Sequence, residues 1–169
     1  MAAFILYEPL LKRLEGYGKY TNYPGDLGSH TMSGVTLTTY RQYFGKEKTV
    51  DDLKNMPESE WRYIMKRGYW DKAGADSIRN QSVAELIADF CVNSGVGMLK
   101  KVQALVGADQ DGIIGPMSLA AINGADQRLL FNAVMAERRC KYYEIVANNY
   151  SQKSNLNGWL NRLKYFSFK

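Results

Sequence analysis

The sequence predicts an all-α protein with at most a small β-hairpin near its N-terminus. Two observations support this fold class. Apolar residues recur at three- and four-residue steps along most of the chain, and no stretch alternates apolar and polar residues over a useful length. The 169 residues are 46% hydrophobic and 12% aromatic, which is enough to form one substantial core. We therefore expect a single folded domain over residues 1–169.

The first predicted helix spans Phe4–Leu14 and has an amphipathic pattern. Its proline, Pro9, predicts a kink or a later start. The two glycines in Glu15-Gly16-Tyr17-Gly18 allow backbone conformations that other residues avoid, so Glu15 is expected at the end of this helix. The apolar positions on the inner face are Phe4, Tyr7, Leu11 and Leu14.

A polar segment rich in Gly, Asn, Thr and Tyr follows at residues 19–34. Pro24-Gly25-Asp26 interrupts it, which predicts a loop or a small hairpin between Lys19 and Val35. Thr36 then suits the N-cap of a short helix that ends at Phe44.

Helices are predicted over the rest of the chain. Pro57 suits the first turn of one helix, and Gly95 suits the C-cap of a core helix. Gly115-Pro116 suits the start of another short helix. The predicted ranges are 50–55, 57–69, 83–93, 99–106, 116–122, 126–147 and 159–166.

The predicted inner face of the long helix at residues 126–147 includes small side chains, which predicts close packing against another helix. This face consists of Leu129, Ala133, Ala136, Cys140 and Tyr143.

Cys91 and Cys140 each lie in an apolar helical pattern, so we expect two buried thiols rather than a disulfide or metal ligands.

The net charge of +5 and the isoelectric point near 9.1 favour an anionic partner. The Lys and Arg residues are scattered in pairs, as on solvated helix faces, so nucleic acid is not expected. The N-terminal residues lack the pattern of a standard secretion signal, and no apolar stretch is long enough for a membrane anchor. We therefore expect synthesis in the cytoplasm.

Glu15 is the main catalytic candidate. A carboxylic acid that stays protonated near neutral pH in a partly apolar site can protonate the leaving oxygen of a glycosidic bond. From spacing alone, a solvated carboxylate at a helix end is an alternative interpretation of Glu15. The adjoining polar loop contains Tyr17, Tyr20, Tyr23, Asp26, His30 and Thr31.

Short motifs occur in order along nearly the whole chain. They are Leu14-Glu15-Gly16-Tyr17 with the segment from Pro24 to Leu37, Tyr69-Trp70-Asp71, Asp89 with Val92-Asn93-Ser94-Gly95, Gln103 with Asp111-Gly112-Ile113-Ile114-Gly115-Pro116, and Gly158-Trp159-Leu160-Asn161-Arg162. In this order they resemble glycoside hydrolase family 108, the bacterial N-acetylmuramidases. The family's Glu-Gly-Gly-Tyr element reads Glu-Gly-Tyr-Gly here.

The resemblance implies a lysozyme-like helical domain and hydrolysis of the β-1,4 bond between N-acetylmuramic acid and N-acetylglucosamine in peptidoglycan. It also implies a catalytic role for Glu15 and no cofactor. The catalytic part would be residues 1–95. Residues 96–169 would form a helical part that contains a peptidoglycan-binding-like segment from Val102 to Ile122.

The expected partners are therefore the glycan strands of peptidoglycan. Members of this family are also described as secretion activators, and endolysins of prophages are a related possibility. Export to the periplasm or cell wall would need a holin or a dedicated secretion machine. We expect a monomer.

Asp26 and Thr31 are candidates for the second catalytic function. With Glu15 they resemble, in order and spacing, the Glu, Asp and Thr of phage-type lysozymes, in which they would position or deprotonate a water. Carboxyl groups about 6.5–9.5 Å apart predict inversion, and about 5–5.5 Å predicts retention. The alternative for Asp26 is a turn residue that hydrogen-bonds its own backbone.

Five residues are candidates for substrate binding, each with a structural alternative. Tyr17 follows Glu15, and His30 is either a cleft residue or a loop hydrogen-bonder. Tyr69 and Trp70 can stack on a sugar or fill a core, and Asn93 can bind an N-acetyl group or cap a helix. His30 is the only histidine and no cysteine cluster accompanies it, so no metal site is expected.

Two other functions remain open. A lytic transglycosylase also uses one glutamate but forms a 1,6-anhydro product without water. A non-catalytic protein that binds the wall or assists secretion is the alternative from another class, and the altered Glu-Gly-Tyr-Gly element favours it.

Overall fold

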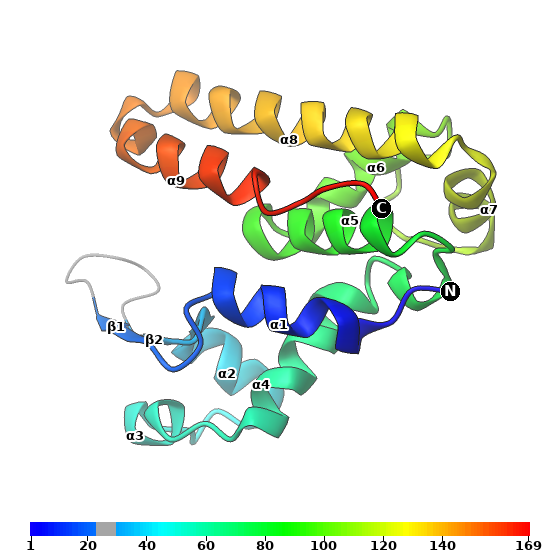
Figure 1. The fold of residues 1–169 in the computed structure, drawn as a ribbon. Helices are drawn as coiled ribbons and strands as arrows, with labels where there is room; N and C mark the ends of the chain where they lie inside the picture. Colours follow the sequence, from blue (N-terminus) through cyan, green and yellow to red (C-terminus); the bar gives the residue numbers. More distant parts are fainter. Residues whose placement is uncertain (23–29) are drawn as a thin grey trace. The chain divides into compact units, whose positions relative to one another are not determined.

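The computed structural model describes residues 1–22 and 30–169 as a mostly helical chain with two compact units. The N-terminal unit comprises residues Ile5–Gly68. The C-terminal unit comprises Tyr69–Lys169 together with Met1–Phe4. Figure 1 shows the order of the helices and strands, and each unit is described by itself below.

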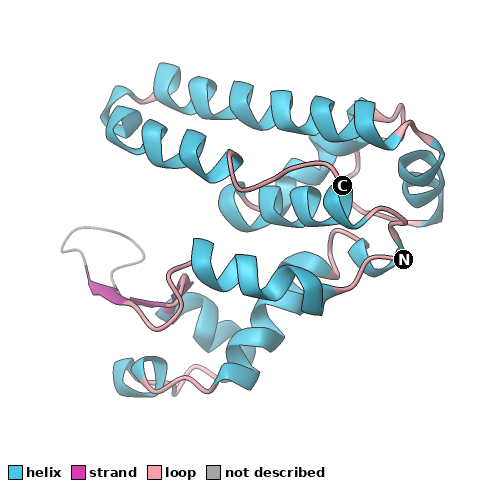
Figure 2. Ribbon diagram, viewed as in Figure 1, coloured by secondary structure: helices cyan, strands magenta, loops and turns pink. Residues whose placement is uncertain are grey.

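The N-terminal unit combines helices with a small antiparallel sheet of order β1-β2-β3, drawn as strands in Figure 2. The sheet supplies the predicted hairpin. A π-helical turn, Lys66–Trp70, follows the last helix. The elements are α1 (Phe4–Leu14), β1 (Tyr20–Asn22), β2 (His30–Met32), β3 (Val35–Thr36), α2 (Leu37–Phe44), α3 (Val50–Lys54) and α4 (Glu58–Met65).

Local capping sets the starts of two short helices, and the cap at Thr36 was predicted from the sequence. The hydroxyl of Thr36 accepts a hydrogen bond of 3.1 Å from the backbone N–H of Thr39, which caps α2. Thr49 and Asp52 form a capping box at the start of α3. Helix α1 begins at Phe4 and contains Pro9, so of the two expected effects of this proline, a kink or a late start, the late start does not occur.

The C-terminal unit contains helices joined by loops, and no strand occurs among its described residues. Helix α8 packs along α5 and α9, which lie beside it in Figure 1. The predicted starts at Pro116 and after Asp126 are confirmed. The elements are η2 (Ala75–Ser77), α5 (Gln81–Ser94), η3 (Val96–Met98), α6 (Leu99–Leu105), α7 (Pro116–Gly124), α8 (Gln127–Asn148), η4 (Tyr150–Gln152) and α9 (Lys153–Leu163).

A buried charge cluster joins α5, α8 and α9. The fully buried carboxylate of Asp89 accepts hydrogen bonds from Nη2 of Arg138 at 2.7 Å and from Nη2 of Arg162 at 2.6 Å. Arg138 also donates to the hydroxyl of Tyr142, which donates to Asn93 at 2.7 Å. Removing one partner would leave a buried charge uncompensated and would destabilise the packing of these helices.

Three predictions about the last two helices are wrong. The predicted inner face of α8 is displaced, because Leu129, Ala136, Cys140 and Tyr143 are exposed. The expected buried thiol at Cys140 is therefore exposed, whereas Cys91 is buried as predicted. Helix α9 spans Lys153–Leu163 rather than 159–166. The residues of α8 that are buried are Leu130, Phe131, Val134, Arg138 and Tyr142.

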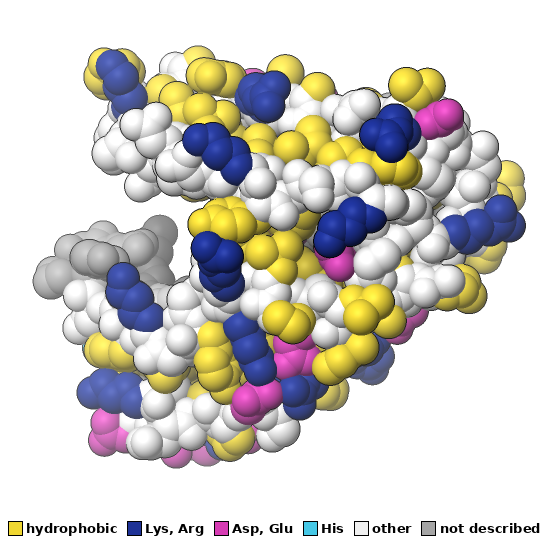
Figure 3. All heavy atoms as spheres, in the orientation of Figure 1, with side chains coloured by type: hydrophobic (Ala, Val, Ile, Leu, Met, Phe, Trp, Pro, Cys, Tyr) yellow, Lys and Arg dark blue, Asp and Glu magenta, His cyan; other side chains and the backbone are white. Residues whose placement is uncertain are grey.

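The predicted fold class, lysozyme-like and helical with a small hairpin, is confirmed by this architecture. The division at Gly68 differs from the sequence-based boundary at residues 95 and 96, since α5 packs with α8. The single-domain organisation stays a prediction. No helix in the described ranges is long and apolar enough to cross a membrane. Figure 3 shows Lys and Arg side chains dispersed over one face rather than gathered in one patch.

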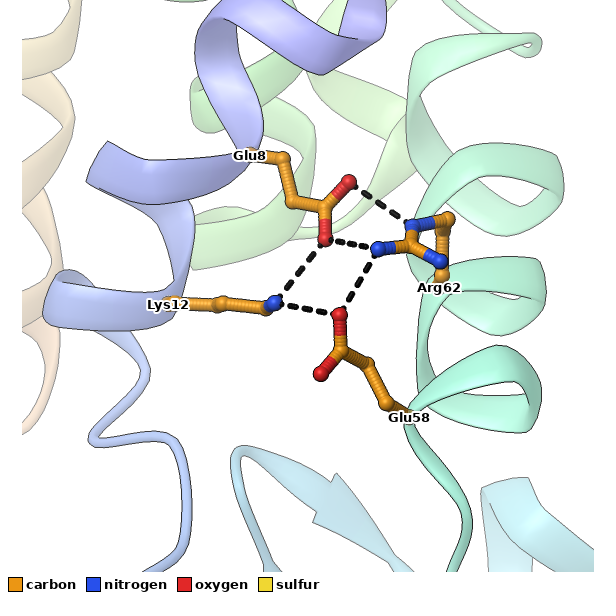
Figure 4. Close-up of polar contacts among 4 residues, drawn as sticks. All are labelled: Glu8, Lys12, Glu58 and Arg62. Atoms are coloured by element: carbon orange, nitrogen blue, oxygen red, sulfur yellow. Dashed lines mark hydrogen bonds and ion pairs between the residues drawn. The ribbon is translucent and has the colours of Figure 1, made fainter.

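An ion-pair network connects α1 with α4 inside the N-terminal unit (Figure 4). Arg62 donates to both carboxylate oxygens of Glu8, each at 2.8 Å. The Nζ atom of Lys12 lies 3.0 Å from Glu8 and 2.7 Å from Glu58, and Arg62 also binds Glu58. The Glu8 side chain is 4% exposed, so water screens these contacts weakly.

The hydrogen bonds from Arg62, followed by those from Lys12, lower the pKa of Glu8 below its ordinary value. A lowered pKa in the folded state stabilises the fold above pH 4.5, and this contribution is lost as the pH falls through the folded-state pKa. We predict that Glu8→Gln lowers the free energy of unfolding at pH 7 by about 1–3 kcal/mol. Urea denaturation followed by circular dichroism measures this.

The difference between Glu8→Gln and wild type should shrink as the pH falls below 4.5, because Glu8 becomes protonated in the wild type. The control is Asp51→Asn, which removes an exposed carboxylate 3.8 Å from Lys54 and should change stability by less than about 0.5 kcal/mol. A difference that stays constant over this pH range would contradict the assigned role of Glu8.

Candidate active site

Glu15 lies directly after α1, as the sequence predicted. Its backbone N–H donates to the carbonyl of Leu11 at 2.9 Å, which continues the helical pattern by one residue. Gly16 and Gly18 then adopt positive φ values of 61° and 84°, which glycine tolerates best. Glu15 therefore stands where the chain turns away from the helix axis, and its side chain is half-buried.

The turn between β2 and β3 lies opposite Glu15. Met32 pairs with Val35, so Ser33 and Gly34 form a two-residue hairpin loop. Their φ values are 53° and 79°, and positive φ at both positions is the mark of a type I′ turn. Ser33 is the only non-glycine residue with positive φ in the described chain. This backbone conformation costs about 1–3 kcal/mol for a residue that has a side chain.

Three hydrogen bonds offset the cost at Ser33, which is buried. Its hydroxyl accepts from the backbone N–H of Gly18 at 2.9 Å, and its own N–H donates to the carbonyl of Lys19 at 2.9 Å. Its carbonyl accepts from Nε1 of the buried Trp61 at 2.9 Å. One residue thus connects the hairpin turn with the loop after Glu15 and with α4.

Gly34 provides the space for the Glu15 side chain. A Cβ atom at position 34 would lie 2.3 Å from Oε2 of Glu15 and 3.0 Å from its Cβ. Real Cβ atoms do not approach other atoms that closely, so the carboxylate packs directly against the α-carbon of Gly34. No role for Ser33 or Gly34 was predicted from the sequence. The signal that could have revealed them is the Ser-Gly pair between two short strands.

Tyr17 lies beside the same turn, held by an aromatic and a cationic contact. Its ring meets Trp61 edge to face, with centroids 5.1 Å apart. The Nζ atom of Lys12 lies 4.9 Å from the ring centroid of Tyr17. Because the Tyr17 side chain remains 39% exposed, it can still contact a ligand.

The hairpin carries the other two described candidates of this unit. Thr31 occupies the central strand, opposite Thr21 and Thr36. Nδ1 of His30 lies 2.7 Å from the hydroxyl of Tyr20, and the two rings are stacked. This bond agrees with the alternative of a loop hydrogen-bonder, while a contact of His30 with substrate stays a prediction.

Asp26 lies outside the described residues. Its distance from Glu15, and with it the choice between inversion and retention, therefore stays a prediction.

Tyr69, Trp70 and Asn93 belong to the C-terminal unit rather than to the unit that holds Glu15. Trp70 is fully buried, its Nε1 donates to Asp76 at 2.6 Å, and its ring meets Phe4 edge to face. This placement favours the core alternative, since no face of the ring is open to a sugar. Asn93 accepts from Tyr142, and Tyr69 lies in the π-helical turn.

Within residues 1–22 and 30–169, no group of three His, Cys, Asp or Glu side chains is placed to hold a metal ion. The chemistry that this geometry offers is that of a carboxyl group placed beside a hairpin turn. Glu15 is held between the end of α1 and the turn at Gly34, next to the half-exposed ring of Tyr17. A positioned carboxyl group can donate or accept one proton.

The contact between Gly34 and Glu15 is open to test by substitution. Gly34→Ala should reduce the free energy of unfolding by about 2–4 kcal/mol, because backbone strain and a clash with Glu15 add together. Gly18→Ala is the matched control, since Gly18 also has positive φ but a Cβ atom added there would have no neighbour within 4 Å. Gly18→Ala should reduce the free energy of unfolding by only about 1–2 kcal/mol, which is the cost of backbone strain alone. Equal losses in urea denaturation would contradict the contact.

Two family models match successive parts of the chain. The family described as glycosyl hydrolase 108 matches residues 11–95, just over half of the chain. This span includes Glu15, the hairpin turn and α4. A second family, described as a predicted peptidoglycan domain, matches residues 96–164. The two matches meet at residues 95 and 96.

A solved structure titled SagA, from Brucella abortus, is similar to the whole chain. It has a TM-score of 0.75 and 24% sequence identity, and the alignment covers 98% of this chain and 97% of that one. No curated protein matches the chain. The structural likeness supports the fold, and the match over more than half of the residues shows the family. This chain belongs to glycosyl hydrolase family 108.

Proposed function

We propose that this chain hydrolyses the β-1,4 bond between N-acetylmuramic acid and N-acetylglucosamine in peptidoglycan, with Glu15 as the general acid. The observation that carries the proposal is the contact of the Glu15 carboxylate with Gly34, inside the span that matches glycosyl hydrolase 108. The match of residues 96–164 to a peptidoglycan domain supports peptidoglycan as the partner.

Hydrolysis of a glycosidic bond requires a proton for the leaving oxygen, delivered by a group within hydrogen-bond reach. Glu15 suits this role because it directly follows α1 and its carboxylate lies against the turn between β2 and β3. Its backbone N–H donates to the carbonyl of Leu11, and its side chain meets Gly34. A carboxyl group that is already positioned for the reaction favours catalysis.

The remaining roles rest on the resemblance to lysozymes. Asp26 with Thr31 would position or deprotonate the attacking water, and Tyr17 with His30 would contact the glycan. Thr31 and His30 lie on β2, the middle strand of the sheet whose turn meets Glu15. Tyr69 and Asn93 stay proposed substrate contacts, whereas the burial of Trp70 supports a structural role.

We predict that Glu15→Gln lowers the rate of peptidoglycan hydrolysis by at least about a hundredfold, because the amide keeps the shape of the side chain and removes the proton donor. Zymography and turbidity of purified cell walls measure the loss. Glu47→Gln is the control, since Glu47 is an exposed glutamate of the same unit. Circular dichroism should show that both variants are folded. Equal clearing by wild type and Glu15→Gln would contradict the role of Glu15.

Mass spectrometry of the released muropeptides identifies the reaction. Hydrolysis yields reducing N-acetylmuramic acid ends, and this is the expected result. Products with 1,6-anhydro ends would show a lytic transglycosylase instead. Folded wild-type protein that binds cell walls but releases no fragments would show a non-catalytic binding protein.

A further inference from the structure

A surface pocket of about 430 Å³ lies in the C-terminal unit, whereas Glu15 belongs to the N-terminal unit. The loop between α6 and α7 and the first turns of α7 form it. It lies entirely within the span that matches a peptidoglycan domain. The lining residues that matter for binding are Ala108, Asp109, Asp111, Ile113, Met117 and Ser118.

The wall of this pocket is built on the buried side chain of Gln103. Its Nε2 donates to Oδ1 of Asp111 at 2.7 Å, to the carbonyl of Ile113 at 3.0 Å and to the hydroxyl of Ser118 at 3.0 Å. Its Oε1 accepts from the backbone N–H of Gly112 at 2.8 Å. Because one amide bonds to three residues of the loop and to Ser118 of α7, the pocket is formed before any ligand arrives.

The pocket combines negative charge with apolar walls. Asp109 and Asp111 are both exposed, and neither forms an ion pair with any described residue. The hydrogen bond from Gln103, followed by that from the backbone of Ile113, holds the pKa of Asp111 below its usual value. Lys100 is the nearby cation that acts on Asp111. Ile113 and Met117 are 70% and 82% exposed.

Charge and shape together select one part of peptidoglycan. The sugars of the glycan strands carry no cation. The diamino acid of the stem peptide, in contrast, has an aliphatic side chain that ends in an ammonium group when it is not cross-linked. An aliphatic chain suits the walls formed by Ile113 and Met117, and an ammonium group suits the two carboxylates.

We propose that this pocket binds the side chain of the stem-peptide diamino acid, with its ammonium group at Asp109 and Asp111 and its methylene groups against Ile113 and Met117. The proposal rests on peptidoglycan being the substrate of the chain. Cross-linking converts the amine to a neutral amide, so the pocket would favour stems whose amine is free. The C-terminal unit would thereby direct the enzyme to wall that is weakly cross-linked.

The test titrates the full wild-type chain with a synthetic stem tripeptide, L-Ala-γ-D-Glu-L-Lys, and with the same peptide acetylated on its side-chain nitrogen. NMR spectra of methyl-labelled methionine report binding at Met117, and EDTA excludes divalent cations from the carboxylates. The free amine should shift the Met117 signal and bind about fivefold more tightly than the acetylated peptide. Equal binding, or no shift with either peptide, would overturn the proposal.

Asp109→Asn should weaken binding of the free amine about threefold to fivefold and leave binding of the acetylated peptide unchanged. Asp109 is the better position to change, because Asp111 also holds the loop through Gln103. Asp51→Asn, an exposed carboxylate in the other unit, is the control and should bind as wild type does. A chitin oligosaccharide that shifts Met117 as strongly as the peptide would overturn the assignment to the stem.

The outcome is independent of the hydrolytic proposal, because the tripeptide contains no glycosidic bond. Loss of the stem-binding result would leave the assay of Glu15→Gln unaffected. Conversely, if Glu15 proved to have no role in hydrolysis, the chain would still bind the peptide with a free amine more tightly than the acetylated peptide.

Discussion

The carboxylate of Glu15 packs against the α-carbon of Gly34, and this contact joins the end of α1 to the turn between β2 and β3. The contact requires a residue without a side chain at position 34 and a turn that brings it to the end of α1. The left-handed conformation of Ser33 supplies that turn, and its bonds to Gly18, Lys19 and Trp61 keep it in place. Backbone strain at a candidate active site is thus balanced by hydrogen bonds within the same unit.

Charged groups support the fold of each unit in a similar way. In the N-terminal unit, Glu8, Lys12, Glu58 and Arg62 connect α1 with α4, and Lys12 also lies over the ring of Tyr17. In the C-terminal unit, Asp89 is shared by two arginines from α8 and α9. Such clusters are costly to desolvate, and loss of one partner leaves the charge of the other uncompensated.

Features that depend on neighbouring residues could be predicted from the sequence. Thr36 and Gly95 cap their helices as expected, and the glycines after Glu15 correctly indicated a helix end. The contact of Glu15 with Gly34 could not be predicted, because it depends on how a distant hairpin folds back. The prediction of which side of α8 is buried was wrong for a related reason. Arg138 is buried against Asp89, whereas an apolar pattern assigns arginine to the surface.

The most direct test of the role of Glu15 is a crystal structure of Glu15→Gln bound to a peptidoglycan glycan fragment of several sugars. The substitution preserves the substrate during crystallisation. We predict that the side chain at position 15 remains against Gly34 and lies about 2.6–3.2 Å from the oxygen of the bond to be cleaved. A fragment bound with that oxygen beside a different carboxyl group, and away from position 15, would contradict this role.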